Sequence, residues 1–191
     1  MKNIYLVNYS VKGIKTLDEL ISLSFYKKTI TRNLDTQEYN VKGIYGMNGS
    51  GKSAIVTSAD ILRNLLTNPG YLNNPIVQKN LEELINKKLG ELFISVDFLV
   101  NLNKQENSIP VLMRYMVTIS QNSNGKYAIS HEKLSCKNAC RKSDFMFNVF
   151  ETQKGDVISV IDEAENPFLK RFLDKTTNLL EDNSMCVLFF D

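Results

Sequence analysis

The sequence has no long apolar run and few cysteines. No apolar stretch approaches the roughly 18 residues that a membrane-spanning helix needs, so we expect no contact with a membrane. The first residues, MKNIYLVNYSVKG, lack the long apolar region and the small-residue cleavage site of a secretion signal. The 3 cysteines make an odd count at irregular spacing, which favours a reducing compartment. These absences predict a cytoplasmic protein.

Charge of one sign is not in excess either. The chain has 23 Lys and Arg against 21 Asp and Glu, so no global field directs it to nucleic acid or to an acidic membrane. With 43% hydrophobic and 23% charged residues the composition is that of an ordinary globular protein, and 191 residues suffice for one sizeable core. No internal repeat, low-complexity tract or Pro- or Ser-rich linker divides the sequence. We therefore expect a single globular unit.

What the sequence does contain is a glycine-rich segment, YGMNGSGKSAIV, at residues 45–56. The pattern G-x-x-x-x-G-K-[ST] is matched without a mismatch by Gly46, Gly51, Lys52 and Ser53. Glycines permit positive φ and carry no Cβ atom, so successive backbone N–H groups can turn inward around a phosphate. The dipole of a following helix attracts the same anion. The segment therefore predicts a phosphate-binding loop.

The residues of this loop have separate expected roles. Lys52 is expected to contact the outer phosphates as a catalytic residue, and the Ser53 hydroxyl to bind Mg²⁺. The expected cofactors are ATP and Mg²⁺, with the backbone amides of residues 47–53 around the phosphates. The predicted nucleotide-binding residues are Gly46, Met47, Asn48, Gly49, Ser50, Gly51, Lys52, Ser53 and Ala54. The base-recognition motif N-K-x-D of G proteins is not found in the sequence.

The residues on either side of the loop fit a strand, a loop and a helix in succession. Before the loop, Val41, Ile44 and Tyr45 predict a short strand. After it, one face of a predicted helix carries Ile55, Ala59, Leu62 and Leu66. The motif requires this context. The alternative is a Gly-rich turn before an unrelated helix.

A second helix is predicted after the first. Asn74 is a candidate N-cap with Pro75 at the first helical position, and Gly90 follows the last turn. The apolar face of this helix is formed by Ile76, Leu81, Leu84, Ile85 and Leu89. Such a face indicates packing against a core rather than a binding site.

The remainder of the chain predicts antiparallel strands. β-branched and aromatic residues dominate LFISVDFLV and VLMRYMVTIS. Hairpin turns are expected at Asn124-Gly125, of the primed type, and at Lys154-Gly155. The expected fold class is α/β, a P-loop NTPase lobe with an antiparallel β subdomain. Its segments are 1–90 with the first strand, the loop and a helical arm, 91–161 with an antiparallel meander, and 162–191 with a helix and a terminal strand.

This succession resembles the N-terminal lobe of an ABC-type ATPase head. The segments that carry the resemblance are KNIYLVNY, GMNGSGKS, a helical arm, ELFISVDFLV and KYAISHEKL. The most similar group is the AAA-type ATP-binding proteins of bacterial abortive-infection and OLD-like systems, relatives of the RecF and SMC heads. Their P-loop commonly reads G-x-N-G-[SA]-G-K-[ST], which residues 46–53 match at each position, and 132–134 is a softer match to a strand that ends in E-x-L. The resemblance implies an ATP-binding protein with a part in phage defence.

Two later stretches are candidates for the Walker B strand, whose Asp positions Mg²⁺ and whose Glu activates water. In VISVIDEAENP, Asp162 and Glu163 follow an apolar strand, which makes Asp162 a candidate Mg²⁺ ligand and Glu163 a candidate catalytic base. MCVLFFD ends in Asp191, which lacks a following Glu. The alternative for the first stretch is a hairpin strand that passes into a helix starting at Asn166 and Pro167. The alternative is favoured because no serine- and glycine-rich signature precedes residue 162.

The resemblance also implies which partners the chain needs. In such heads ATP is sandwiched between the P-loop of one subunit and the signature of another, so hydrolysis is expected to require a C-terminal lobe and a second ATPase subunit. A chain that ends at CVLFFD, just after an apolar strand, is expected to be half of an ATPase. The alternatives are a complete small NTPase or kinase that uses Asp162 and Glu163, and a regulatory module that binds nucleotide without turnover.

Two further groups of residues suggest binding only weakly. His131, Cys136, Cys140 and Cys186 do not form the two closely spaced ligand pairs of a structural zinc site, so we expect a partly exposed histidine and ordinary thiols. The basic segment KNACRKSD has no interleaved aromatic residues. A solvated loop is expected there, with nucleic-acid contact as the minor alternative.

Overall fold

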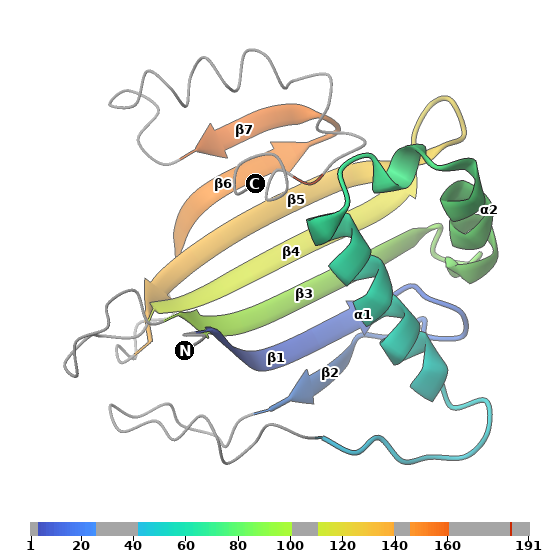
Figure 1. Cartoon of the computed structure of the whole chain (residues 1–191), viewed down its shortest axis with the longest axis horizontal. Helices are drawn as coiled ribbons and strands as arrows, with labels where there is room; N and C mark the ends of the chain where they lie inside the picture. Colours follow the sequence, from blue (N-terminus) through green and yellow to red (C-terminus); the bar gives the residue numbers. More distant parts are fainter. Residues whose placement is uncertain (1–3, 26–41, 101–110, 140–145, 161–183, 185–191) are drawn as a thin grey trace.

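The computed structural model describes residues 4–25, 42–100, 111–139, 146–160 and 184. Its main feature is a 7-stranded sheet in the order β2-β1-β3-β4-β5-β6-β7 (Figure 1). Every neighbouring pair of these strands is antiparallel. The strands are β1 (Ile4–Lys12), β2 (Ile21–Ser24), β3 (Glu91–Val100), β4 (Val111–Gln121), β5 (Tyr127–Asn138), β6 (Phe147–Gln153) and β7 (Asp156–Val160). The helices are α1 (Lys52–Thr67), the 3₁₀ helix η1 (Tyr71–Asn73) and α2 (Pro75–Leu84).

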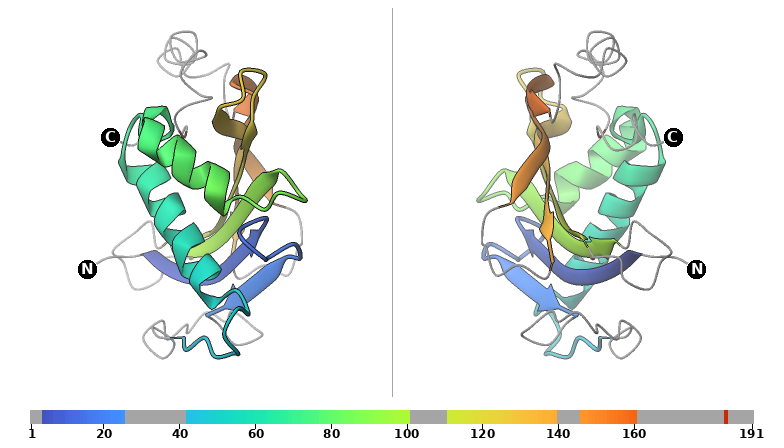
Figure 2. Two further views of the ribbon diagram at one scale, coloured as in Figure 1. Left: turned by 90° about the vertical axis from the view of Figure 1, so that its right-hand side faces the viewer. Right: turned by 90° about the vertical axis from the view of Figure 1, so that its left-hand side faces the viewer.

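The expected α/β fold class is wrong. An α/β sheet is mostly parallel and is covered by helices on both faces. The described strands are instead all antiparallel, and α1 and α2 lie on the same side of them (Figure 2). The predicted strand before the loop is also wrong for its described part, because residues 42–47 form no strand and Tyr45 is 94% exposed. A strand there has no place beside β1, since β2 and β3 already pair with both edges of β1.

The antiparallel meander itself is confirmed. Strands β3 to β7 follow one another in space as they do in sequence. Alternate residues of the central strands are buried on the helix-covered face, and they meet across the sheet in register. One such row joins Val11, Ile94 and Val117, each at most 1% exposed. The core of the protein therefore lies between this face and the helices.

Helix α1 covers the sheet with an apolar stripe that contains one polar residue. Its buried residues are Ala54, Ile55, Ser58, Ile61, Leu62 and Leu65. Ile55 and Leu62 were expected on this stripe, whereas Ala59 is exposed. Ser58 is buried instead because its hydroxyl lies 2.7 Å from the hydroxyl of Tyr9 on β1. Burial raises the pKa of Tyr9 to about 12, although the hydrogen bond with Ser58 acts in the other direction.

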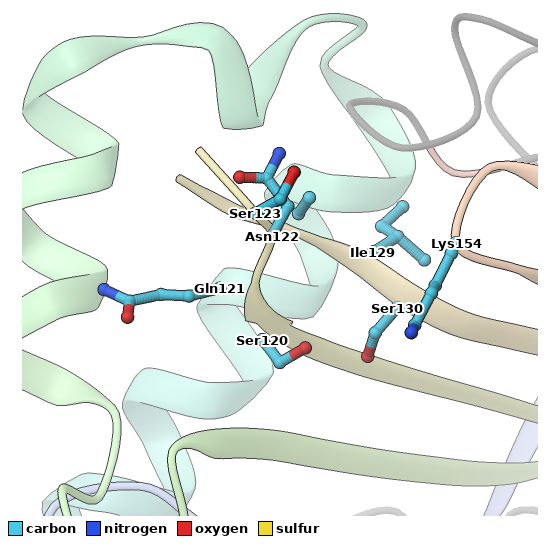
Figure 3. Close-up of a pocket in the computed structure, with 8 residues that line it drawn as sticks. Ser120, Gln121, Asn122, Ser123, Ile129, Ser130 and Lys154 are labelled. Atoms are coloured by element: carbon cyan, nitrogen blue, oxygen red, sulfur yellow. The ribbon is translucent and has the colours of Figure 1, made fainter. Parts of the chain in front are cut away.

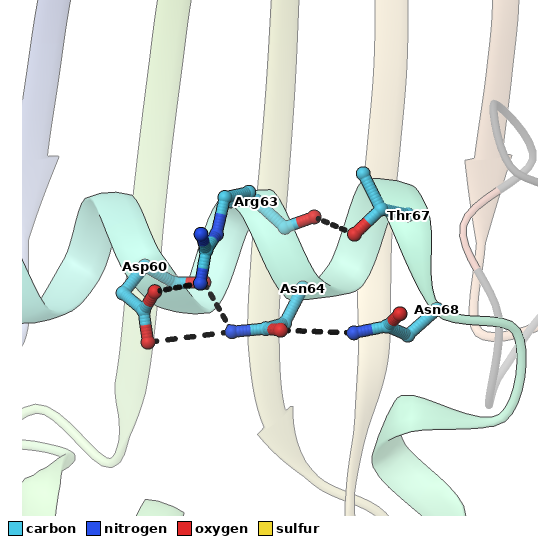
Figure 4. A network of polar contacts seen from close by, with 5 residues as sticks. All are labelled: Asp60, Arg63, Asn64, Thr67 and Asn68. Carbon is cyan, nitrogen blue, oxygen red and sulfur yellow. Dashed lines mark hydrogen bonds and ion pairs between the residues drawn. The ribbon is translucent and has the colours of Figure 1, made fainter.

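The outer face of α1 is polar, and its side chains form hydrogen bonds with one another and with the helix backbone (Figure 4). Arg63 donates to the Asp60 carboxylate at 2.7 Å, and Asn68 donates to the Asn64 side chain at 2.9 Å. The Thr67 hydroxyl donates to the Arg63 carbonyl at 2.8 Å. Exposed pairs of this kind contribute little stability. The network therefore indicates a solvated surface.

Helix α2 starts as predicted but ends earlier. The Asn74 side chain accepts a hydrogen bond from the Ile76 amide at 2.9 Å, and Pro75 takes the first helical position. The helix ends at Leu84 because Ile85 leaves it to form a β-bridge with Ile14. Ile76, expected on the apolar face, is 70% exposed.

The side chain of Gln78 fastens α2 to the sheet. Its Nε2 donates to the Tyr127 carbonyl at 2.8 Å, and its Oε1 accepts from the Tyr127 amide at 2.8 Å. Nε2 also donates to the Leu72 carbonyl at 2.6 Å. One side-chain amide thereby joins the first residue of β5 and the 3₁₀ helix η1 to α2.

The two predicted hairpin turns have different outcomes. Lys154 and Gly155 have φ values of 49° and 83° and connect β6 to β7 in two residues, which is the primed geometry. In the β4–β5 turn only Gly125 has positive φ, at 75°, so the primed type predicted for Asn124-Gly125 is wrong. The Asn122 carbonyl accepts from Gly125 at 3.0 Å, and the Asn122 side chain accepts from Asn124 at 3.0 Å. The side chain of Asn122 thus stabilises a different turn.

Gly13 provides a test of the contact between the β1–β2 turn and β3. Its φ is 84°, and a Cβ atom there would lie 1.9 Å from the Glu91 carbonyl oxygen. Gly13→Ala should therefore lose about 1 kcal/mol to left-handed strain and roughly 1–3 kcal/mol more to overpacking. Gly90→Ala is the matched control, because Gly90 has a φ of 69° with no atom near the added Cβ. Urea unfolding should show a larger loss for Gly13→Ala; equal losses would contradict the contact.

Candidate functional site

The glycine-rich segment forms a curled loop before α1. Gly49 and Gly51 have φ values of 83° and 87°, and Gly51 is the N-cap of α1 without any side-chain cap. The Lys52 ammonium donates to the carbonyls of Gly46 and Met47, each at 2.6 Å. The ammonium thereby joins the start of the loop to its end.

Most amides of this loop make no hydrogen bond to the described residues. The Ser50 amide donates to the Met47 carbonyl at 3.2 Å. The amides of Asn48, Gly49, Gly51, Lys52 and Ser53 donate to no acceptor in the described part of the chain. Free amides at the N-terminus of a 16-residue helix attract an anion, because the helix dipole places partial positive charge there.

An open hollow of about 430 Å³ lies against the loop. Of the predicted residues, it is lined by Asn48, Gly49, Gly51, Lys52 and Ser53. Gly46, Met47, Ser50 and Ala54 do not line it. Met47 is 84% exposed, and Ala54 is buried on the sheet-facing side of α1. The remaining lining residues are Lys15 and Thr16, from the turn between β1 and β2. No local pattern in the sequence pointed to these two residues.

The β1–β2 turn is held close to the loop. A Cβ atom on Gly51 would lie 2.5 Å from a methyl carbon of Leu17, which is itself only 8% exposed. The second glycine of the motif therefore allows close packing as well as the left-handed φ. The wall of the hollow is thus built from two segments that are distant in sequence.

Glu132, the first residue of the E-x-L stretch at 132–134, lies in the core. It is 0% exposed on β5 and accepts hydrogen bonds from the Tyr115 hydroxyl at 2.7 Å and from the Ser184 hydroxyl at 2.5 Å. Hydroxyl donors of this kind compensate for burying a carboxyl group. Glu132 does not line the hollow at the loop.

A second, smaller hollow lies at the end of the β4–β5 hairpin (Figure 3). It measures about 220 Å³, and Lys154 and Ser130 lie side by side in it. Ser130 is an extra residue in β5, because Thr118 pairs with His131 and Ile119 with Ile129. The Ser130 carbonyl accepts from the Lys154 amide at 3.0 Å. This hollow has one lysine and no glycine loop or helix start, so the loop at residues 46–53 is the better candidate for a phosphate site.

Several predicted residues lie outside the described residues. These are Asp162, Glu163, Asp191, Cys140 and Cys186, together with the helix and terminal strand expected at 162–191. The candidates for metal binding and general-base work therefore remain predictions. No helix in the described part of the chain is long and apolar enough to cross a membrane.

No protein-family model matches this chain, and no curated protein matches it. The chemistry of the loop and of the residues that surround it is therefore what indicates a function.

The face of the sheet opposite α1 carries ion pairs on β5 and β6. Glu151 on β6 accepts from Lys133 at 2.7 Å, lies 2.9 Å from the His131 ring and accepts from Asn148 at 3.1 Å. The hydrogen bond from Lys133, followed by that from His131, lowers the pKa of Glu151. His131 and Cys136 are five positions apart on β5, so their side chains point to opposite faces of the sheet. This arrangement is that of a structural ion-pair cluster.

The lowered pKa of Glu151 predicts how stability depends on pH. A carboxyl group with a lowered folded-state pKa stabilises the fold above its unfolded pKa, about 4.3 for Glu, and this stabilisation is lost as pH falls through the folded-state value. Glu151→Gln should therefore be less stable than wild type at pH 7, and the difference should disappear in acid. Urea unfolding between pH 7 and pH 2 measures this, with Glu83→Gln on the exposed side of α2 as the control. A difference that persists unchanged in acid would show that the ion pairs do not stabilise the fold.

Proposed function

We propose that this chain binds the phosphates of Mg-ATP through residues 46–53. The observation that carries the proposal is the conjunction of a complete G-x-x-x-x-G-K-S match with free loop amides at the start of α1. Amides, a lysine and a serine converge on one hollow, and the described residues that line it include no carboxylate. An anion entering this hollow meets N–H and O–H donors and two lysines, and no carboxylate among the described lining residues.

The position of Lys52 suits this role. An ammonium group has three N–H donors. Two of the contacts it can make go to the Gly46 and Met47 carbonyls, which leaves one donor for a phosphate oxygen. A lysine held in this way is oriented before the ligand arrives, so less conformational entropy is lost on binding.

Ser53 is the proposed Mg²⁺ contact. Its hydroxyl is exposed at the first turn of α1 and has no hydrogen-bond partner in the described part of the chain. Mg²⁺ binds oxygen ligands, keeps several waters and commonly shares substrate phosphate oxygens. When bound, the ion would neutralise phosphate charge while Ser53 helps to fix its position.

The proposal separates binding from hydrolysis. Hydrolysis requires a metal-holding acid, a group that orients water and donors that meet charge developing on the γ-phosphate. Lys52 and the loop amides bind ground state and transition state alike, and such uniform binding does not lower the chemical barrier. We therefore propose that turnover needs a C-terminal lobe or a second ATPase subunit, as in the heads that the sequence resembles.

Binding predicts a thermal shift. Ligand at 100 times its Kd stabilises a protein by about 2.7 kcal/mol, which corresponds to roughly 5–10 °C for a chain of this size. Mg-ATP should therefore raise the Tm of the wild type, Lys52→Ala should remove the shift, and Lys126→Ala on the β4–β5 turn should retain it. Competition between ATP and GTP tests the choice of base. A folded wild-type protein without any shift at millimolar Mg-ATP would overturn the proposal.

A second prediction is that the chain alone hydrolyses ATP negligibly, although it binds it. Phosphate release should stay at the level of Lys52→Ala, and Asp162→Asn should leave the Mg²⁺ dependence of ATP affinity nearly unchanged. Robust release by the wild type that Lys52→Ala abolishes would favour the alternative of a complete NTPase using Asp162 and Glu163.

A further inference from the structure

The hollow at the loop has a second cationic wall that the motif does not contain. Lys15 and Thr16 line it together with residues of the glycine loop. Lys15 thus adds a second lysine to the lining of the hollow that Lys52 also lines. The Lys15 ammonium has no acceptor in the described part of the chain, whereas the Lys52 ammonium already contacts two loop carbonyls.

The backbone of Lys15 is held in place by tertiary contacts. Its φ is 51°, in the left-handed region that costs a non-glycine residue about 1–2 kcal/mol. The Lys15 amide donates to the Leu84 carbonyl at 2.6 Å, and the Asn86 side chain donates to the Lys15 carbonyl at 2.8 Å. Its neighbour Ile14 is 0% exposed, so the turn is anchored in the core. The exposed side chain of Lys15 is thus attached to a backbone that hydrogen bonds hold in place.

The acidic residue closest to Lys15 in sequence is already paired. Asp18 accepts from the Lys88 ammonium at 3.1 Å, and this hydrogen bond lowers the pKa of Asp18. The Asp18 carboxylate is therefore occupied by a lysine that does not line the hollow. Lys15 has no ion pair among the described residues, and its charge stays available to a ligand.

We propose that Lys15 is a second phosphate-binding lysine of this site, and that it makes the site prefer a nucleoside triphosphate to a diphosphate. This inference rests on the proposed function. The loop amides and Lys52 lie together at the start of α1. A further cation on the facing segment adds most when the ligand carries the extra charge of a third phosphate. Thr16 supplies a hydroxyl on the same wall.

The structure offers a matched pair of substitutions for the test. Lys15→Asn removes the charge and keeps a residue that tolerates left-handed φ. Lys154→Asn makes the same change at a lysine with a φ of 49°, in the β6–β7 turn and away from the loop. Lys15→Arg keeps the charge. Isothermal titration at one ionic strength should give the Kd of Mg-ATP and Mg-ADP for each variant and for Lys52→Ala.

We expect Lys15→Asn to weaken Mg-ATP binding by about 10-fold, as for the loss of one charge-assisted hydrogen bond, with a smaller effect on Mg-ADP. Lys154→Asn should bind both nucleotides as the wild type does, and Lys15→Arg should weaken Mg-ATP binding less than Lys15→Asn does because it keeps the charge. If Lys15→Asn binds Mg-ATP normally while Lys52→Ala does not, the inference fails and the proposed function stands. Equal weakening of ATP and ADP overturns the preference for triphosphate. A wild type that binds neither nucleotide overturns both the proposed function and the inference.

Discussion

The need to bury one face of an antiparallel sheet determines how the described part of this protein is arranged. Tyr9, Val11 and Ile94 all point to the same side, and this side must be covered because an exposed apolar sheet face is unfavourable in water. Helix α1 covers it (Figure 1). The hydrogen bond between Tyr9 and Ser58 fixes the rotation of α1, because it brings a polar helix residue to a single point on the sheet. The position of the glycine loop follows, since that loop ends where α1 begins.

The parts of the fold that the sequence predicted correctly are those determined by patterns within a short segment. Runs rich in β-branched and aromatic residues identified β3 and β4, Asn74 and Pro75 marked the start of α2, and Lys154-Gly155 marked a tight turn. The errors arose where a distant partner decides the structure. Ile85 leaves the helical pattern because Ile14 pairs with it, and the supposed strand before the loop finds both edges of β1 occupied.

The same distinction applies to the candidate site. The loop residues are contiguous, so their spacing alone indicates phosphate chemistry. Lys15 and Thr16 come from a turn whose place depends on the packing of Leu17 against Gly51 and on hydrogen bonds to Leu84 and Asn86. A lysine in a short turn has no local pattern that distinguishes a ligand contact from a solvated side chain. Only the tertiary arrangement brings the two segments to one hollow.

The side-chain amide of Gln78 bonds both backbone groups of Tyr127, as a neighbouring strand would. Tyr127 pairs with Gln121 of β4 on one side, and the described β5–β6 pairing begins only at His131. Unpaired groups at such an overhang are a template on which a strand of another molecule can assemble. Because Gln78 occupies both the amide and the carbonyl of Tyr127, a foreign strand cannot pair with this residue while α2 is in place. Release of α2 would expose both groups, so α2 also protects the start of β5.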